Sequence, residues 1–328
     1  NLSKNTMKKV VTLGGGTGNF TVLRGLKKYP LDLTAVVSMA DDGGSTGVLR
    51  DELGVLPPGD VRQCLVALSD SSKLMRNLMN YRFDNGCLQG HSFGNLLLSA
   101  LEKVTGSFET SVEEVSRIMN IKGKVLPITT NEVRLKMILD NNKILNGEGE
   151  IYLSEEIDQG FRSIFLEPIP KVNQRAIDAI MNADLIVLGP GGLYSSLIPL
   201  LLVEGVSKAL RETKAEKVFV VNLMNRKGQT TGFTTNGYLK EIRRYLGKDV
   251  FDFIVVNDGK PPQELVEVYA KEGELIENDL MEEERVIVAD LLSSKLKQAD
   301  KVDLMARNLI RHDRKKLTQI LMGIIHEI

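Results

Sequence analysis

Short apolar runs alternate with longer segments of helical periodicity along most of this chain. The apolar runs lie at 8–13, 33–37, 183–188, 217–222, 251–256 and 285–289. The segments with helical spacing lie at 19–28, 61–68, 93–104, 112–119, 174–181, 238–246 and 302–325. Continuous apolar strands separated by helices are typical of a parallel sheet that is covered on both faces. The pattern therefore predicts an α/β fold with a doubly wound, mostly parallel, Rossmann-like sheet.

One stretch departs from this rhythm. Between about residues 124 and 168, apolar and polar residues alternate, as in Val133, Leu135 and Met137. Asn141-Asn142-Lys143 follows as a strong hairpin signal. We expect residues 7–328 to form a single α/β domain, into which residues 124–168 are inserted as a small antiparallel, β-rich subdomain.

Glycine-rich segments follow three of the predicted strands. They are Gly14-Gly15-Gly16-Thr17-Gly18, Asp41-Asp42-Gly43-Gly44-Ser45-Thr46-Gly47 and Gly189-Pro190-Gly191-Gly192-Leu193-Tyr194-Ser195. Glycine allows a ligand to approach the main chain closely, and the start of a following helix favours phosphate. Each segment alone is also compatible with an ordinary tight turn. Together they predict one nucleotide-sized crevice at the carboxyl ends of the strands.

Several common site patterns do not fit. The dinucleotide pattern G-x-G-x-x-G requires glycine at a sixth position that is Asn19 or Thr21 here, depending on the starting glycine. There is no P-loop lysine, no G-x-S-x-G elbow, no H-E-x-x-H and no cluster of His and Cys. Nicotinamide-dependent oxidation, nucleophilic hydrolysis and zinc chemistry are therefore disfavoured.

The paired acids Asp41 and Asp42 end the second predicted strand. They are suited to hold Mg²⁺ against a diphosphate or to bind sugar hydroxyls, and alternatively they begin an Asx-turn. Ser45 and Thr46 offer hydroxyl donors to a phosphate. Arg50 offers a bidentate clamp for the same group.

Further polar candidates lie in the next two helical segments. Asp60 is a candidate helix N-cap, and Arg62 in the same first turn is aimed at an anion or at an acid such as Asp42. His91 is a candidate proton donor or phosphate contact, with a structural role as the alternative. Asn95, at the start of an apolar helix, predicts a side-chain hydrogen bond into the crevice.

Composition adds limits to this picture. The chain has 328 residues and a formal net charge of −1, so it carries no overall field that would recruit nucleic acid or a membrane. No apolar run approaches the roughly 20 residues that span a bilayer. Cys64 and Cys87 are too few for a disulfide framework. We expect a cytoplasmic protein.

Five segments carry a resemblance to a known family. They are VVTLGGGTG (10–18), ADDGGSTGVLRDELGVLPPGDVRQCLVALS (40–69), GHSFGNLLLSAL (90–101), GKVLP (123–127) and ADLIVLGPGGLYSSLIPLLL (183–202). In this order they resemble the gluconeogenesis factor family, the YvcK-like proteins, which are related to 2-phospho-L-lactate transferase (CofD-like). The match spans the main α/β domain.

The chain departs from the transferase branch of this group. That branch carries a Ser-Pro-Asp-Leu-Asp-Thr type of sequence, associated with deazaflavin binding, where this chain has Pro57-Pro58-Gly59-Asp60-Val61-Arg62. The departure argues against transferase activity. Leu200 is a smaller departure, since the family usually has Asn after the proline.

The resemblance implies a cytoplasmic regulatory factor that is required for cell shape and cell-wall synthesis under gluconeogenic growth. It implies binding of UDP-sugars, UDP-N-acetylglucosamine in particular, without an established reaction or a certain cofactor. The alternative is a Mg²⁺-dependent transferase of phosphorus-containing groups, with Asp41 and Asp42 as metal ligands. The implied partners are a nucleotide sugar, proteins of cell-wall synthesis or morphogenesis and further copies of the chain.

The resemblance also places two ligand contacts near the C-terminus. Tyr269 is suited to stack on uracil and Arg311 to bind the diphosphate, although Tyr269 is also compatible with helix packing. The complete set of candidate ligand-binding residues is Gly14, Gly15, Gly16, Thr17, Gly18, Asp41, Asp42, Gly43, Gly44, Ser45, Thr46, Arg50, Asp60, Arg62, His91, Asn95, Gly189, Gly191, Gly192, Tyr194, Ser195, Asn222, Tyr269 and Arg311. No catalytic residue is assigned.

Overall fold

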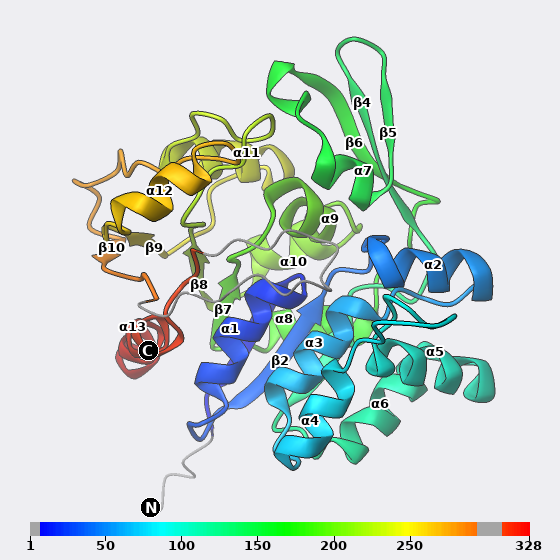
Figure 1. Cartoon of the computed structure of the whole chain (residues 1–328). Helices are drawn as coiled ribbons and strands as arrows, with labels where there is room; N and C mark the ends of the chain where they lie inside the picture. Colours follow the sequence, from blue (N-terminus) through cyan, green and yellow to red (C-terminus); the bar gives the residue numbers. More distant parts are fainter. Residues whose placement is uncertain (1–6, 294–309) are drawn as a thin grey trace, which may run out of the picture.

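A seven-stranded parallel sheet forms the centre of the molecule (Figure 1). The computed structural model describes residues 7–293 and 310–328. The strand order is β10-β9-β8-β7-β1-β2-β3. The strands are β1 (Lys9–Gly14), β2 (Asp32–Val37), β3 (Lys124–Pro127), β7 (Leu185–Leu188), β8 (Glu216–Val220), β9 (Phe253–Asn257) and β10 (Val286–Ala289). The predicted α/β class and the mostly parallel sheet are confirmed.

The direction in which strands are added reverses at β1. This strand pairs with β2 on one side and with β7 on the other, both in parallel. The helices that follow β1 and β7 therefore cover opposite faces of the sheet, as right-handed crossovers require. Val22, Leu23 and Leu26 of the first helix are at most 1% exposed, which places them in the core. The boundary between β1 and β7 is the topological switch point, where open α/β sheets bind ligands.

Helices surround the sheet on both sides (Figure 1). They are α1 (Gly16–Leu26), α2 (Gly44–Leu53), α3 (Gly59–Leu68), α4 (Lys73–Asn80), α5 (Phe93–Thr105), α6 (Phe108–Ile118), α7 (Glu148–Leu153), α8 (Gln174–Met181), α9 (Ile198–Leu201), α10 (Val206–Glu212), α11 (Thr235–Leu246), α12 (Gln263–Tyr269) and α13 (Arg314–Glu327). A 3-10 turn covers Ile157–Gln159, and the π-helical turn η2 covers Leu193–Leu197.

Three helix predictions need correction. Asp60 is not the N-cap of α3, because the helix already begins at Gly59 after Pro58, and Asp60 lies in its first turn. The first helix begins at Gly16 rather than Asn19, so the end of the first glycine run forms its first turn. The predicted helix over 302–325 is wrong for residues 310–313, which precede α13, while 302–309 lie outside the described residues. Asp313 caps α13 by accepting hydrogen bonds from the backbone N–H groups of Lys315 and Lys316. This cap fixes the start of the helix there.

The expected small sheet is present, with a different starting point. Its order is β5-β4-β6, from β4 (Arg134–Leu139), β5 (Ile144–Asn146) and β6 (Phe161–Glu167), and both pairings are antiparallel. The predicted hairpin turn connects β4 to β5. Residues 124–127, expected to begin the insertion, instead form β3 and pair in parallel with β2 in the main sheet. Apart from Lys124, these residues are apolar because they are buried at the edge of the main sheet. Their sequence therefore looks like that of the insertion strands, which explains the misplaced boundary.

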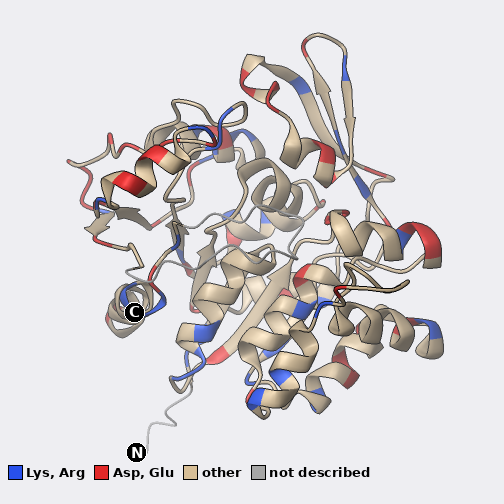
Figure 2. Cartoon of the chain, viewed as in Figure 1, with Lys and Arg blue, Asp and Glu red and all other residues tan. Residues whose placement is uncertain are grey.

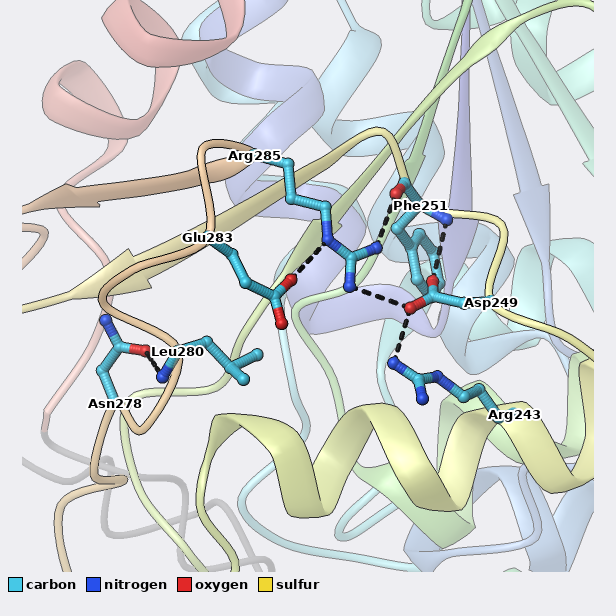
Figure 3. A network of polar contacts seen from close by, with 7 residues as sticks. All are labelled: Arg243, Asp249, Phe251, Asn278, Leu280, Glu283 and Arg285. Carbon is cyan, nitrogen blue, oxygen red and sulfur yellow. Dashed lines mark hydrogen bonds and ion pairs between the residues drawn. The ribbon is translucent and has the colours of Figure 1, made fainter.

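Ion pairs connect the segments that precede β9 and β10, at the β10 edge of the main sheet (Figure 3). Asp249 accepts a hydrogen bond of 2.9 Å from Arg285, which precedes β10, and one of 2.6 Å from Arg243 of α11. Arg285 also donates to the main-chain oxygen of Phe251 at 2.9 Å. Burial acts to raise the pKa of Asp249, but the hydrogen bonds from Arg285 and the Phe251 N–H hold it below its ordinary value. The network ties β9, β10 and α11 together.

Over the described residues, neither the distribution of charge nor the length of the apolar helices sets this molecule apart. Figure 2 shows basic and acidic residues interspersed over the molecule, which agrees with the near-zero net charge. Within residues 7–293 and 310–328, no single helix has the length and apolar character of a membrane crossing. One sharply bent pair, Leu193–Leu201 with Val206–Glu212, passes that test by length and composition alone.

Candidate ligand-binding site

A cavity of about 340 Å³ opens at the switch point, where β1, β2, β7 and β8 end. The predicted residues that line it are Gly15, Gly16, Thr17, Gly18, Asp41, Gly43, Gly44, Ser45, Thr46, Asp60, Arg62, Asn95, Gly191, Gly192, Ser195, Asn222, Tyr269 and Arg311. The predicted residues outside the lining are Gly14, Asp42, Arg50, His91, Gly189 and Tyr194. The expectation that the glycine-rich segments share one crevice is confirmed.

The first glycine segment contacts the third one directly. A Cβ atom added to Gly18 would lie 1.6 Å from the main-chain oxygen of Pro190, so only glycine fits at this position. Thr17 donates a hydrogen bond of 3.2 Å from its hydroxyl to Gln63 of α3. The start of α1 is thereby held between α3 and the turn after β7. The first residues of α1 line the cavity, and the start of a helix is a place that suits a phosphate.

The two acids after β2 have separate tasks. The Asp41 carboxylate lines the cavity and accepts a hydrogen bond of 3.0 Å from the Gly43 N–H. Burial raises its pKa, against the opposing effect of hydrogen bonds from Gly43 and Thr46. Asp42 lies outside the lining, where it accepts a hydrogen bond of 2.7 Å from the Gly149 N–H. Its second partner is Arg134 of β4, at 3.8 Å. Asp42 therefore joins the main domain to the inserted subdomain.

Arg50 is a structural residue in this arrangement. Its side chain is 2% exposed, and its guanidinium donates to the main-chain oxygens of Asp41 at 3.2 Å and Val133 at 2.6 Å. The phosphate clamp proposed from the sequence needs an open guanidinium, whereas this one is directed at main-chain carbonyls. It holds the loop after β2 against the segment that enters β4.

A series of hydrogen-bonded polar side chains holds Ser45 of the second glycine segment, residues 41–47. His91 Nδ1 lies 3.0 Å from the Ser45 hydroxyl, and the Asn95 amide donates to that hydroxyl at 3.3 Å. Arg62 Nε donates to Asn95 Oδ1 at 2.9 Å, and Arg62 Nη1 donates to Asn80 at 2.6 Å. His91 thus acts on the site through Ser45, while Arg62 and Asn95 reach the cavity wall. Arg62 Nη1 also lies 3.4 Å from the Met79 main-chain oxygen, to which it donates, and Asp42 has partners in Gly149 and Arg134.

The turn after β7 is fixed by a side chain from the next strand. Asn222, two residues after β8, accepts a hydrogen bond of 3.0 Å from the Gly191 N–H and donates one of 2.8 Å to the Gly191 oxygen. Ser195 faces the cavity, but Tyr194 points into the core. Tyr194 is 3% exposed and packs edge-on against Phe161 at 5.3 Å, and burial raises its pKa. It belongs to the packing of the insertion.

The most important residue that the sequence did not single out is Glu148. It begins α7 of the insertion, lines the cavity and is only 7% exposed. Burial raises its pKa well above the ordinary value, and Asp41, Asp60 and Asp42 act in the same direction. The flanking glycines in Gly147-Glu148-Gly149 were the one signal that could have found it.

The cavity wall also includes aromatic and basic side chains. The Arg226 guanidinium lies over the Tyr152 ring, 3.8 Å from its centre, and both residues line the cavity with Tyr269 and Arg311. Tyr269 is 4% exposed, and its hydroxyl accepts a hydrogen bond of 3.3 Å from the Ile310 N–H. Tyr269 therefore combines packing with a place in the wall. Tyr152 and Arg226 come from loops and helix ends that carry no sequence motif.

Comparison with known proteins identifies the family. The profile of the family described as 2-phospho-L-lactate transferase CofD matches residues 10–309. A gluconeogenesis factor from Bacillus subtilis is 37% identical over 325 residues, which cover 97% of this chain and 98% of the relative. One from Halalkalibacterium halodurans is 42% identical over 268 residues, covering 81% of this chain and 82% of the relative. The chain belongs to the CofD-like gluconeogenesis factor family.

A solved structure agrees with this membership of the gluconeogenesis factor family. The crystal structure of a member of the UPF0052 family from Bacillus halodurans has a TM-score of 0.86 and 36% identity. The similarity covers 97% of this chain and 99% of that one. Because the similarity extends over almost the whole of both chains, the main sheet and the insertion are features that this chain shares with that family member. The resemblance inferred from the five sequence segments is confirmed.

Proposed function

We propose that the protein is a cytoplasmic nucleotide-sugar-binding regulatory factor with UDP-N-acetylglucosamine as its ligand. Its role would be to adjust cell shape and cell-wall synthesis during gluconeogenic growth, through contacts with proteins of those processes. The name of the relatives, gluconeogenesis factor, supports the metabolic part of this proposal. The ligand part is supported by the two unlike groups of residues in the cavity wall.

The observation that carries the proposal is that the wall of one cavity combines glycine-rich turns with aromatic and basic side chains. In the glycine-rich turns, the starts of α1 and α2 offer main-chain N–H groups for a diphosphate. Elsewhere in the same wall, Tyr152 and Tyr269 offer apolar faces for uracil, and Arg226 and Arg311 offer positive charge. A volume of about 340 Å³ lies in the range of small-molecule sites.

A thermal-shift panel of UDP-N-acetylglucosamine, UDP-glucose, GDP, GTP, NAD and NADP tests the proposal. Ligand at about 100 times its Kd stabilises the folded state by roughly 2.7 kcal/mol. For a chain of this size we expect a rise in Tm of a few degrees with UDP-N-acetylglucosamine. A flat response to the UDP-sugars together with a clear response to NAD would overturn the proposal in favour of an oxidoreductase.

A Mg²⁺-dependent CofD-type transferase is the second candidate, since the matching family profile carries that activity in its description. It requires metal ligands beside the diphosphate, where Asp41 lines the cavity and Asp42 is engaged by Gly149. Among the described residues, no group of three or more His, Cys, Asp or Glu side chains has the geometry to hold a metal ion. The Pro57–Arg62 segment also differs from the transferase branch.

Isothermal titration with and without EDTA separates the two candidates. We expect UDP-N-acetylglucosamine to bind with the same Kd in both conditions, because main-chain N–H groups and guanidinium groups bind a diphosphate directly. Binding that is strictly dependent on Mg²⁺ would contradict the regulatory proposal and favour the transferase.

A further inference from the structure

Helix α7 forms one wall of the cavity and is held at both ends by the main domain. At its start, the Gly149 N–H donates to Asp42 at 2.7 Å. At its end, Gln229 Nε2 donates to the main-chain oxygens of Ile151 at 2.9 Å and Tyr152 at 2.7 Å. In Figure 1 this helix lies at the end of the small sheet that faces the main domain. The inserted subdomain is therefore part of the ligand site.

The side chain that α7 brings into the cavity has unused hydrogen-bonding capacity. Glu148 is 93% buried, and its Oε2 atom has no hydrogen-bond partner among the described residues. The Ser195 hydroxyl bonds the same carboxyl group. A buried polar atom without a partner costs free energy, so its persistence at a cavity wall points to a partner supplied by a ligand.

The surroundings of Glu148 determine what kind of partner that is. Asp41 and Asp42 face it from the loop after β2, Asp60 from α3, and Ser195 from η2. On its own helix the titratable neighbours are Glu150 and Tyr152, and Arg226 stacks on Tyr152. Arg134 of β4 pairs with Asp42, while β5 carries no titratable side chain. Burial and the acids that dominate this list both raise the pKa of Glu148, and so both act in favour of its neutral carboxylic acid.

We propose that Glu148 is a ligand-binding residue whose carboxylic acid donates a hydrogen bond from Oε2 to a phosphate oxygen of the nucleotide sugar. This inference rests on the proposed function. An ionised glutamate beside Asp41 and Asp60 would repel a diphosphate, whereas a protonated one supplies a donor at the same place. The inserted subdomain would then contribute a ligand contact that is present at low pH and lost as the pH rises through the pKa of Glu148.

The test is isothermal titration of UDP-N-acetylglucosamine into the full chain between pH 5.5 and 8.5. This ligand is chosen because its diphosphate is esterified at both ends, so it lacks the phosphate ionisation near pH 6 of a monoester. We expect the Kd of the unaltered protein to be constant at low pH and to rise above the pKa of Glu148. Glu148→Gln, which keeps a donor, should bind with about the low-pH Kd throughout, and Glu148→Ala should bind about tenfold more weakly at low pH.

Glu150→Gln on the exposed side of the same helix is the matched control and should follow the unaltered protein. Equal Kd values for all four proteins at every pH would overturn the assignment of Glu148 while leaving the proposed function intact. The same would follow if Glu148→Gln kept the full pH dependence, which would assign the titration to Asp41. Absence of binding by the unaltered protein at any pH would overturn both proposals. Uridine, which lacks phosphate, serves as a second probe: a loss with Glu148→Ala as large for uridine as for the nucleotide sugar would overturn the phosphate contact.

Discussion

The Oδ1 atom of Asp42 accepts a hydrogen bond of 2.7 Å from the main-chain N–H of Gly149, which lies 107 residues further along the chain. This contact turns one of a pair of adjacent acids into an anchor for the inserted subdomain. The other acid, Asp41, remains at the cavity. Two residues that look equivalent in the sequence are thus separated by their partners.

Replacing Asp42 by Ala should release the start of α7. The loss of a hydrogen bond to an ionised acceptor should lower the free energy of unfolding by about 1.5–3 kcal/mol, as measured by urea denaturation. Hydrogen exchange should become faster at residues 147–153. Asp51→Ala is the control, because Asp51 lies on α2 and pairs with the same Arg134, with 58% of its side chain exposed. A similar effect of both substitutions would show that only the ion pair matters.

Replacing Gly147 by Ala should also loosen this junction. Gly147 has a φ of +118°, and an added Cβ atom would lie 2.2 Å from Asp42 Oδ2. We expect a loss of about 2–3 kcal/mol in the free energy of unfolding, from backbone strain and the displaced carboxylate. Gly54→Ala, at φ +58° and ψ +48° with open space around it, measures the smaller cost of a left-handed conformation that L residues can adopt. The prediction fails if the two variants unfold at the same urea concentration.

Replacing Gly18 by Ala should separate the turns after β1 and β7. The added methyl group would meet the main-chain oxygen of Pro190, which no rotamer change can move away. We expect a loss of about 3 kcal/mol in the free energy of unfolding, together with loss of binding in the thermal-shift assay. Gly323→Ala in α13 has open space and should stabilise the protein by about 0.5–1 kcal/mol. Normal stability of Gly18→Ala would contradict the close approach.

The Asp249 network predicts a pH-dependent contribution to stability. Because the pKa of Asp249 is lowered on folding, its contribution is complete above the ordinary aspartate pKa of about 4 and disappears as the pH falls through the lower folded value. Asp249→Asn should therefore lower the free energy of unfolding at pH 7, and the difference from the unaltered protein should shrink below about pH 4. Denaturation curves at both pH values measure this. A difference that is constant with pH would exclude the ionised carboxylate as its cause.

The strands were predictable because strands that are buried on both faces consist of continuous apolar, β-branched residues. The start of α1 was not, since Gly16, Thr17 and Gly18 look like turn residues. Gly18 is required by the approach of Pro190, and Gly16 lies against Asp60 and Gln63, which are contacts between residues far apart in the chain. Tertiary packing therefore overrode the local signal.

The site was predictable where its residues follow strands and unpredictable where they come from elsewhere. Arg50 and His91 lie in the right region, but their partners place them behind the cavity wall. Glu148 and Tyr152 reach the cavity because the insertion folds back onto the sheet, which depends on the Asp42 contact and on Gln229. No spacing rule within one segment records such a contact. The roles of the cavity residues in binding remain predictions.

The reciprocal bonds between Asn222 and Gly191 have a kinetic consequence. The Asn222 side-chain amide both accepts from the N–H and donates to the oxygen of one residue, as a neighbouring strand would, so the hydrogen bonding between β7 and β8 is extended one step into the turn. A turn held in this way is preorganised, that is, it has its bound conformation before a ligand arrives. Capture of the ligand should then proceed in one step, with an observed rate that rises linearly with ligand concentration instead of reaching the plateau that a preceding rearrangement imposes.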